Sequence, residues 1–343
     1  MSKTSKIWLI AAAFAIFSGL IIFTVLMATL GWDFQKISGE KFETNTHTLS
    51  EDYSDIFIDT NTAEIIILPS DSKETKIVCY ERMDAKHFPK IQDGTLTLEL
   101  IETGNWLNRI IGFCEPTLTL YVPKGEYSNL RINSSTGDIK ISEGYTFGSI
   151  DIEGDTCNVS VSSPTKGDVK ISVSTGDITL EKTSSKNLLL SASTGTVAAK
   201  NTNCENMDIS VSTGDVYISN VIASGDVTAD ASSGDVYLTN LECKNLNSEA
   251  KTGDIILSST VASGKFTIER STGDVTLDRC DASEIMIKTD TGDVSGSIIS
   301  EKVFIVTTST GDADYPKTTT GGICEITTST GDVEIEYANT PRD

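Results

Sequence analysis

The sequence predicts an all-β protein built as a parallel β-solenoid (β-helix) of about eleven rungs, each 19–20 residues long, and three observations lead to this fold class. The first is a repeat. Between residues 129 and 336 a tight turn close to Ser-Thr-Gly-Asp recurs eleven times. Such a period is typical of a structural unit that stacks on itself. With the turn residue as position 0, the zeros are Gly137, Cys157, Gly176, Gly195, Gly214, Gly234, Gly253, Gly273, Gly292, Gly311 and Gly331.

The second observation is strand-like alternation around each turn. Positions −7, −5, +2 and +4 are apolar in 42 of 44 cases, with Ser248 and Gly296 as the exceptions, and the residues between them are polar. Side chains alternate between the two faces of a strand, whereas a helix needs apolar spacings of three and four. We therefore expect Val275 to face the core and Thr276 to face the solvent.

The third observation is that equivalent positions carry the same residue. Position −1 is Thr in ten of the eleven copies, which favours parallel stacking over a row of antiparallel hairpins. At about 4.8 Å per rung, ten intervals give a two-sheeted rod roughly 50 Å long. Each 20-residue rung has a glycine at +11, where we expect one inserted residue whose backbone only glycine tolerates easily. These glycines are Gly148, Gly225, Gly264 and Gly322.

Residues 51–128 are predicted to form a β-rich N-terminal cap that is continuous with the rod. It includes a degenerate first rung around Ala63 and further strand-like segments with irregular insertions. Terminal repeats of solenoids are usually atypical because they close the end of the core. We assign residues 31–50 to a linker, 129–336 to the regular solenoid and 337–343 to a C-terminal tail.

The N-terminus predicts one transmembrane helix at residues 7–30. This run of 24 residues has no charge and would be about 36 Å long as a helix, enough for a bilayer core of about 30 Å. Lys3 and Lys6 precede it, which places residues 1–6 in the cytoplasm and the solenoid outside a single-pass signal anchor. The alternative is a cleaved signal peptide, but the run is long for one and Ala28-x-Leu30 is a poor cleavage site.

Charge and the rarity of histidine exclude several classes of function. The formal net charge of −22 would repel nucleic acid and anionic lipid. His47 and His87 are the only histidines and lie outside the regular array, so no Ser-His-Asp site is expected on the rod. Of the seven cysteines, only Cys79 and Cys114 are candidates for a disulfide, and no metal-ligand spacing is present. We expect no cofactor and no catalysis.

Aspartate at position +1 is the strongest candidate for chemistry. Neighbouring carboxylates about 4.8 Å apart repel one another, so hydrogen bonds within the turn or bound cations must offset the repulsion. Hard cations prefer carboxylate oxygens, so a column of weak Ca²⁺ sites is one interpretation and turn hydrogen bonding is the other. The seven consecutive residues are Asp215, Asp235, Asp254, Asp274, Asp293, Asp312 and Asp332.

A second candidate is an outward column at position +3. Tyr217, Tyr237 and Ile256 occupy it on three successive rungs. The column could stack for structural reasons alone or form a binding patch for carbohydrate.

The Ser-Thr-Gly-Asp-Val phrases, the segment PTLTLYVPKGEYSNLRINSSTGDIKI and the single N-terminal span resemble a bacterial family of β-strand-repeat proteins known as "putative adhesins", formally a domain of unknown function. The resemblance covers roughly residues 50–336. It implies a parallel β-solenoid displayed outside the membrane and supplies no binding residues.

These observations predict a membrane-anchored, extracytoplasmic structural or binding module, adhesin-like and non-catalytic. The partners expected are the membrane, through its single span, and cell-wall glycan or another envelope protein, but no nucleic acid. A cell-envelope stress sensor acting through a membrane partner is the alternative, and a wall-polysaccharide-active enzyme is the third possibility.

The C-terminal end is predicted to expose the last rung, built on Cys324, Ile326, Val333 and Ile335. Exposed strand edges pair with other chains unless they are blunted, and Pro341 with the charges of Glu334, Glu336, Arg342 and Asp343 would blunt this one. On that basis the ectodomain is expected to be a monomer.

Overall fold

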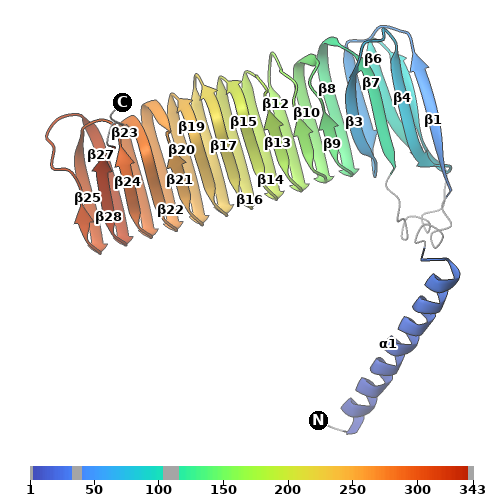
Figure 1. Ribbon diagram of the computed structural model, residues 1–343, viewed down its shortest axis with the longest axis horizontal. Coiled ribbons are helices and arrows are strands. Elements are labelled where there is room, and N and C mark those ends of the chain that lie inside the picture. Colours follow the sequence, from blue (N-terminus) through green and yellow to red (C-terminus); the bar gives the residue numbers. More distant parts are fainter. Residues whose placement is uncertain (1–2, 33–40, 103–115, 339–343) are drawn as a thin grey trace.

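The computed structural model describes residues 3–32, 41–102 and 116–338. It shows a long β-solenoid with one N-terminal helix, α1 (Lys3–Thr29) (Figure 1). This confirms the predicted fold class. Within α1, the 22 residues from Trp8 to Thr29 are long and apolar enough to cross a membrane, and nearly all of their side chains are exposed, Met27 being buried.

The strands stack in two main columns that run along the rod. The column that contains positions −7 and −5 follows the order β5 (Ala85–Gln92), β6 (Thr95–Glu102), β2 (Asp55–Thr60), β8 (Gly125–Thr136), β10 (Tyr145–Thr156), β12 (Val169–Thr175), β14 (Asn187–Thr194), β16 (Asn206–Thr213), β18 (Asp226–Ser233), β20 (Asn245–Thr252), β22 (Val261–Thr272), the second half of β23 (Val275–Thr291), β27 (Gly322–Thr330) and β25 (Lys302–Thr310).

The column that contains positions +2 and +4 follows the same path on the other side of the core. Its order is β1 (Phe42–Leu49), β4 (Thr75–Arg82), β7 (Thr117–Pro123), β3 (Glu64–Ser70), β9 (Ile139–Ile141), β11 (Val159–Val161), β13 (Ile178–Glu181), β15 (Val197–Cys204), β17 (Val216–Ala223), β19 (Val236–Cys243), β21 (Ile255–Ser258), the first half of β23, β24 (Val294–Ile298), β28 (Val333–Tyr337) and β26 (Ala313–Asp314).

The predicted inward face is confirmed. Residues at positions −7, −5, +2 and +4 are buried in every rung except at Gly296 and in the rung built on Gly311. Val275 is buried, whereas Thr276 beside it is partly exposed. These side chains form one continuous core along the rod. Parallel pairing joins equivalent positions of neighbouring rungs, as the threonine column predicted.

The middle rungs have a third paired segment, which the two-sheeted prediction did not include. Position +6 has a positive φ in six consecutive rungs, which breaks the alternation of the strand. Beyond position +6, parallel pairing between rungs resumes: Thr202 pairs with Val221, and Val221 pairs with Leu241. The side chains at positions +7 and +9 face the core. The residues with positive φ are Lys182, Asn201, Asn220, Asn240, Ser259 and Arg279.

Glycine is required at +11 because there is no space for a Cβ atom, and not because of the backbone dihedral angles. None of the four has a positive φ. A Cβ atom at Gly148 would lie 2.4 Å from the carbonyl oxygen of Ser128, and one at Gly264 would lie 2.3 Å from Oδ1 of Asn245. The inserted residue therefore brings this corner against the preceding rung, where only a hydrogen atom fits.

At the N-terminal end, the degenerate rung is not the outermost level. Strands β2 and β3 pair with the first regular rung on one side and with β6 and β7 on the other. Beyond these, β1, β4 and β5 pair antiparallel and close the end of the core. Residues 42–49, which we assigned to a linker, form strand β1 of this cap.

At the C-terminal end, the last two rungs exchange places, and the prediction of the terminal rung is wrong. Strand β27, which carries Cys324 and Ile326, lies between β23 and β25, and β28 lies between β24 and β26. The chain therefore passes over one level, forms the outermost rung with β25 and β26, and returns to fill the gap.

This exchange also removes the predicted blunting of the edge. Glu334 and Glu336 belong to β28, which is paired on both sides. Pro341, Arg342 and Asp343 lie outside the described residues. The strands at the end of the stack are β25 and β26.

Candidate functional site

The aspartates at position +1 form a hydrogen-bonded column along the rod, which is interrupted at Thr196. In each pair the backbone N–H of one rung donates to the carboxylate Oδ1 of its neighbour, at 2.9 Å from Asp235 to Asp215 and 2.7 Å from Asp254 to Asp235. The bonds therefore run between rungs, whereas we expected them within the turn. Asn158 continues the column through its side-chain oxygen, which accepts from the N–H of Asp177 at 2.9 Å.

The exchange of the last two rungs reorders this column. Asp332 donates to Asp293, and Asp312 donates to Asp332, each at 2.7 Å. The seven aspartates thus stand together, in the order Asp215, Asp235, Asp254, Asp274, Asp293, Asp332 and Asp312.

Each donated N–H offsets part of the repulsion between neighbouring carboxylates. Charge-assisted bonds of this kind are shorter and stronger than neutral ones. Nowhere in the part of the chain that the structure describes do three or more His, Cys, Asp or Glu side chains form a group that could hold a metal ion. The Ca²⁺ column stays a prediction, in which an ion would have to bridge two carboxylates and complete its shell with water.

The outward column at +3 is well ordered. The rings of Tyr217 and Tyr237 stack with their centroids 4.7 Å apart and an angle of 2° between the planes. Their hydroxyls donate to Oδ2 of Asp215 and Asp235, at 3.2 and 3.0 Å, and Ile256 lies next to Tyr237 in register. Because the two rings stack face to face, each has one face covered by the other. A sugar would therefore contact mainly the ring edges. The carbohydrate patch stays a prediction.

Two further polar columns lie at corners that the sequence analysis did not single out. At +6 the amide of Asn240 donates to Asn220, and that of Asn220 donates to Asn201, at 2.9 and 3.2 Å. At −8 the amide of Asn206 donates to Asn187 at 2.9 Å. Asparagine tolerates positive φ better than most residues, and its amide both donates and accepts. Asn at a constant phase was the signal that could have revealed both columns.

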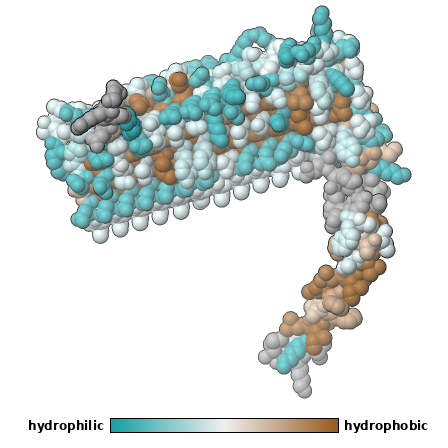
Figure 2. Space-filling view, viewed as in Figure 1, coloured by the Kyte–Doolittle hydropathy of each residue, from teal (hydrophilic) through white to brown (hydrophobic). Residues whose placement is uncertain are grey.

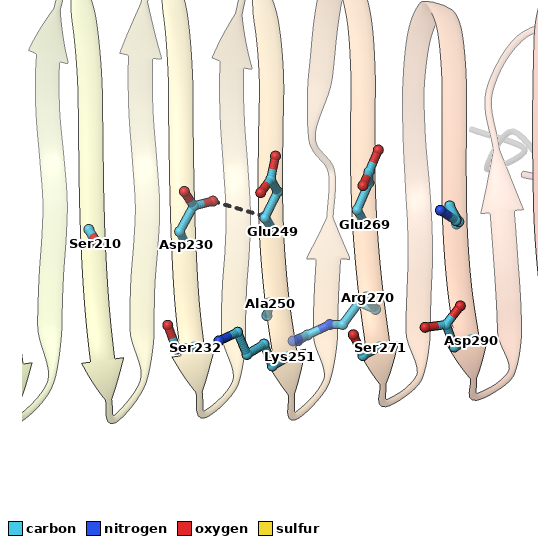
Figure 3. A pocket seen from close by; sticks show the side chains of 11 residues that line it. Ser210, Asp230, Ser232, Glu249, Ala250, Lys251, Glu269, Arg270, Ser271 and Asp290 are labelled. Atoms are coloured by element: carbon cyan, nitrogen blue, oxygen red, sulfur yellow. Dashed lines mark hydrogen bonds between the residues drawn. The ribbon is translucent and has the colours of Figure 1, made fainter.

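One trough on the outward face gathers charged side chains of both signs. It has a volume of about 370 Å³ and crosses the strands from β16 to β23 (Figure 3). Asp230 and Glu249 lie on one side of it, with Lys251 and Asp290 nearer the turns. Three carboxylates, those of Asp230, Glu249 and Glu269, follow one another along the strands, while Lys251 and Lys288 bring ammonium groups to the same trough.

The strand pairing is interrupted beneath this trough. The carboxylate of Asp230 accepts the backbone N–H of Glu249 at 2.8 Å, and the buried hydroxyl of Ser248 donates to the carbonyl of Ala229 at 2.5 Å. Burial, more than the nearby charge of Glu249, raises the pKa of Asp230. Ser248, one of the two exceptions to the apolar rule, thus compensates for a ladder position that the β18–β20 register skips.

Arg270 is an unpaired buried cation next to this interruption. It stands at position −3, is 4% exposed, and none of its three guanidinium nitrogens has a hydrogen-bond partner. Burial lowers its pKa to about 10, although the charges of Asp254 and Asp235 act in the opposite direction. Thr289 and Thr328, at the same phase, donate their hydroxyls to the turn carbonyls of Gly273 and Gly292.

Arg270→Met should therefore stabilise the rod. The change keeps most of the side-chain volume and removes three unsatisfied donors and a desolvated charge, so we expect the free energy of unfolding to rise by about 1–4 kcal/mol. Denaturant unfolding followed by circular dichroism measures this. Lys251→Met removes an exposed cation from the same trough and should change stability by only about 0.5 kcal/mol. A loss of stability in Arg270→Met would mean that attraction to the aspartate column outweighs burial.

The cap contains a hydrogen-bonded chain of threonine, histidine and glutamate. Oγ1 of Thr60 lies 2.9 Å from Nε2 of His87, and Nδ1 of His87 lies 2.9 Å from Oε2 of Glu81. This order matches nucleophile, base and orienting acid in hydrolases. All three side chains are at least 97% buried, however, and burial lowers the pKa of His87. A nucleophile must reach its substrate, so this chain is a satisfied polar network of the cap.

The cysteines of the described chain are buried. Burial raises the pKa of the thiols of Cys79 and Cys243 to about 12, which makes them poor nucleophiles. The predicted pairing of Cys79 with Cys114 lies outside the described residues, because Cys114 is not among them.

The described chain is a rod of stacked repeats, and its sequence matches a known family. The sequence matches the family Toastrack DUF4097 over residues 53–240 and 222–343. The chain belongs to this family, which confirms the resemblance inferred from the Ser-Thr-Gly-Asp-Val repeats. No curated protein matches the sequence.

Solved structures with a similar chain path include three from Parabacteroides. A putative adhesin from Parabacteroides merdae has 14% identity and a TM-score of 0.39, with 86% of this chain and 96% of that one covered. A putative adhesin from Parabacteroides distasonis has 12% identity and a TM-score of 0.38, with 86% and 97% covered. A putative lipid binding protein from the same species has 16% identity and a TM-score of 0.36, with 75% and 96% covered.

Proposed function

We propose that this protein is a membrane-anchored, extracytoplasmic binding rod that acts in an adhesin-like role without catalysis. The observation that carries the proposal is the relation between α1 and the rod. Most apolar side chains of the helix are exposed, whereas the surface of the rod mixes hydrophilic and hydrophobic residues (Figure 2). The core of the rod is built from residues of the solenoid and cap and includes none from α1.

The direction of the rod supports a role in presentation. Strand β1, the first after the helix, belongs to the cap at one end of the stack, and β25 and β26 form the other end. A helix inserted in the membrane would hold the cap near the lipid and place the Gly311 rung furthest from it. Lysines before the span favour an outward orientation of the rod.

The Thr60–His87–Glu81 chain of the cap is buried, and the turns of the rod carry the same short loop in each rung. A rod with uniform corners and continuous polar columns is suited to spacing and presenting a contact surface. This supports a binding role over hydrolysis of wall glycan.

The proposal is tested by the topology of the full chain in intact cells. Protease added outside should digest the rod, and protein from untreated cells should keep Met1 or Ser2 as its first residue. Inserting two aspartates beside Phe17 should release the rod from the membrane, because charges at the centre of a span are costly. A mature form that begins near Trp32, or a rod protected until the cells are opened, would contradict the anchored topology.

A further inference from the structure

The distal end of the rod carries an open strand edge. Strand β25 pairs with β27 alone, and β26 pairs with β28 alone. Residues 303–310 of β25 (Lys302–Thr310) thus present one side of their backbone without a strand partner in the described chain. Such an edge pairs readily with another strand unless charge, proline or a covering segment prevents it.

On β25 such protection is limited to Lys302, whose carbonyl accepts the hydroxyl of Thr318 and whose N–H donates to the hydroxyl of Tyr337. Lys302 is buried and forms an ion pair with Asp281 at 2.6 Å, and residues 303–310 contain neither a charge nor a proline. Ile305 is 50% exposed, and Ile323 on the neighbouring β27 is 44% exposed. This edge is thus uncharged, apolar in its first half and rich in hydroxyl groups in its second, in a chain with a net charge of −22.

The core is also incomplete at this end. Phe304 and Val306 occupy inward positions, yet both are only partly buried, whereas their equivalents in interior rungs are fully buried. Tyr315 covers part of this surface, with its ring centroid 5.5 Å from that of Phe304. A further level of strands would complete the burial of these side chains.

The membrane-proximal end carries the protection that β25 lacks. Strand β5 carries Pro89 and the charged Lys86 and Lys90, and Lys86 forms an ion pair with Glu43 of β1 that ties the two outer strands together. Proline and lysine on an edge are the usual means of blunting it. A second rod therefore cannot add head to tail, and filaments are excluded.

We propose that two copies of this protein pair end to end through β25 and join their solenoids into one rod of twice the length. A second copy is the occupant that fits, because it offers the same two strand edges at the same separation across the core. The pairing is antiparallel about a two-fold axis, as self-complementary edges require. A register centred on Val306 pairs residues 303–309 of the two copies and keeps Phe304 and Val306 of both copies facing inward.

This arrangement has a consequence for adhesion that rests on the proposed function. The two helices lie at opposite ends of the joined rod, so the partners sit in two facing membranes. The contact is then homophilic, between identical molecules on neighbouring cells.

The test uses the full chain in detergent micelles, with its mass followed by sedimentation equilibrium. We expect a dimer, and negative-stain images should show a rod of double length with a micelle at each end. Ile305→Lys places a charge at the paired edge and should give monomers at concentrations where the unmodified chain is dimeric. Leu189→Lys is the matched control, because Leu189 is an exposed apolar residue at the same phase of an interior rung and should leave the dimer intact.

Thr307→Lys, at another exposed position of β25, repeats the test should Ile305→Lys fold poorly, and circular dichroism verifies the fold of each variant. A monomeric unmodified chain at tens of micromolar overturns the proposal. So does a dimer that survives both β25 changes, which would place the contact in α1, and so does equal dissociation by Leu189→Lys. Since pairing in micelles does not depend on topology in cells, failure here is separate from failure of the anchor.

Discussion

Gly273→Ala should break the rod in its middle. A Cβ atom at this position would lie 1.8 Å from the carbonyl oxygen of Gly253, and the residue has a φ of +139°, which L-residues rarely adopt. Both the clash and the strain involve backbone, so the two rungs must separate. We expect a loss on the order of 4 kcal/mol in the free energy of unfolding.

The loss should be local, because each rung contacts only its neighbours. Hydrogen exchange measured by mass spectrometry should show reduced protection from β22 to the C-terminal rungs, while β8 to β15 keep theirs. Gly125→Ala is the control, because a Cβ atom at Gly125 would have no heavy atom within 4 Å and the residue has no positive φ. Equal loss of protection in the two variants would contradict the steric argument.

Val275→Asp should be at least as damaging. Val275 is fully buried, and an aspartate there would leave a carboxylate without partners in an apolar core, at a cost of about 4 kcal/mol or more. Thr276→Asp, one residue further on, places the same charge on the partly exposed face. It should cost little beyond repulsion by the nearby aspartates. Denaturant unfolding of both variants compares them, and equal destabilisation would show that the inward face is assigned wrongly.

The stacking phase could be predicted from the sequence because two local patterns agree. Alternation identifies which residues of a strand face the core, and identical residues at one phase show that equivalent positions lie side by side. Val275 and Thr276 illustrate both. Position −3 was not included in that pattern, and this is why Arg270 was missed: it occupies an inward phase that holds small or hydroxyl residues in neighbouring rungs.

The order of the last rungs could not be predicted from the repeat. The turns at Gly311 and Gly331 are both Ser-Thr-Gly-Asp, so either could stack on the rung of Gly292 with the same backbone pairing. Only the inward-facing residues of the two rungs could have indicated which rung lies at the end. Ile326 and Val333 belong to a fully apolar set, whereas the Gly311 rung offers Ala313 and Tyr315, followed by a proline, and is better suited to an end position.

The polar columns show a different limit. The sequence reveals that Asp recurs at +1, but not whether its carboxylate bonds within the turn or to the next rung, because the two choices differ only in side-chain rotation. The same holds for Asn201 and Asn220, whose amides bond across rungs at a corner that the alternation pattern treats as a break. Such columns depend on the spacing between rungs, which is a property of the stack.

The exchanged order at the C-terminal end affects the sequence in which the last rungs dock during synthesis. Up to Gly292, each new rung can dock as soon as it emerges, because its platform already exists. The next rung, β25 with β26, has no direct platform until β27 and β28 arrive and insert beneath it. The final strands, β27 and β28, thus join the outermost rung to the rest of the stack. A chain that ended before residue 322 would lack β27 and β28, and β25 would then have no strand to pair with. The exposed edge of β25 at the end of the rod therefore forms only after β27 and β28 are in place.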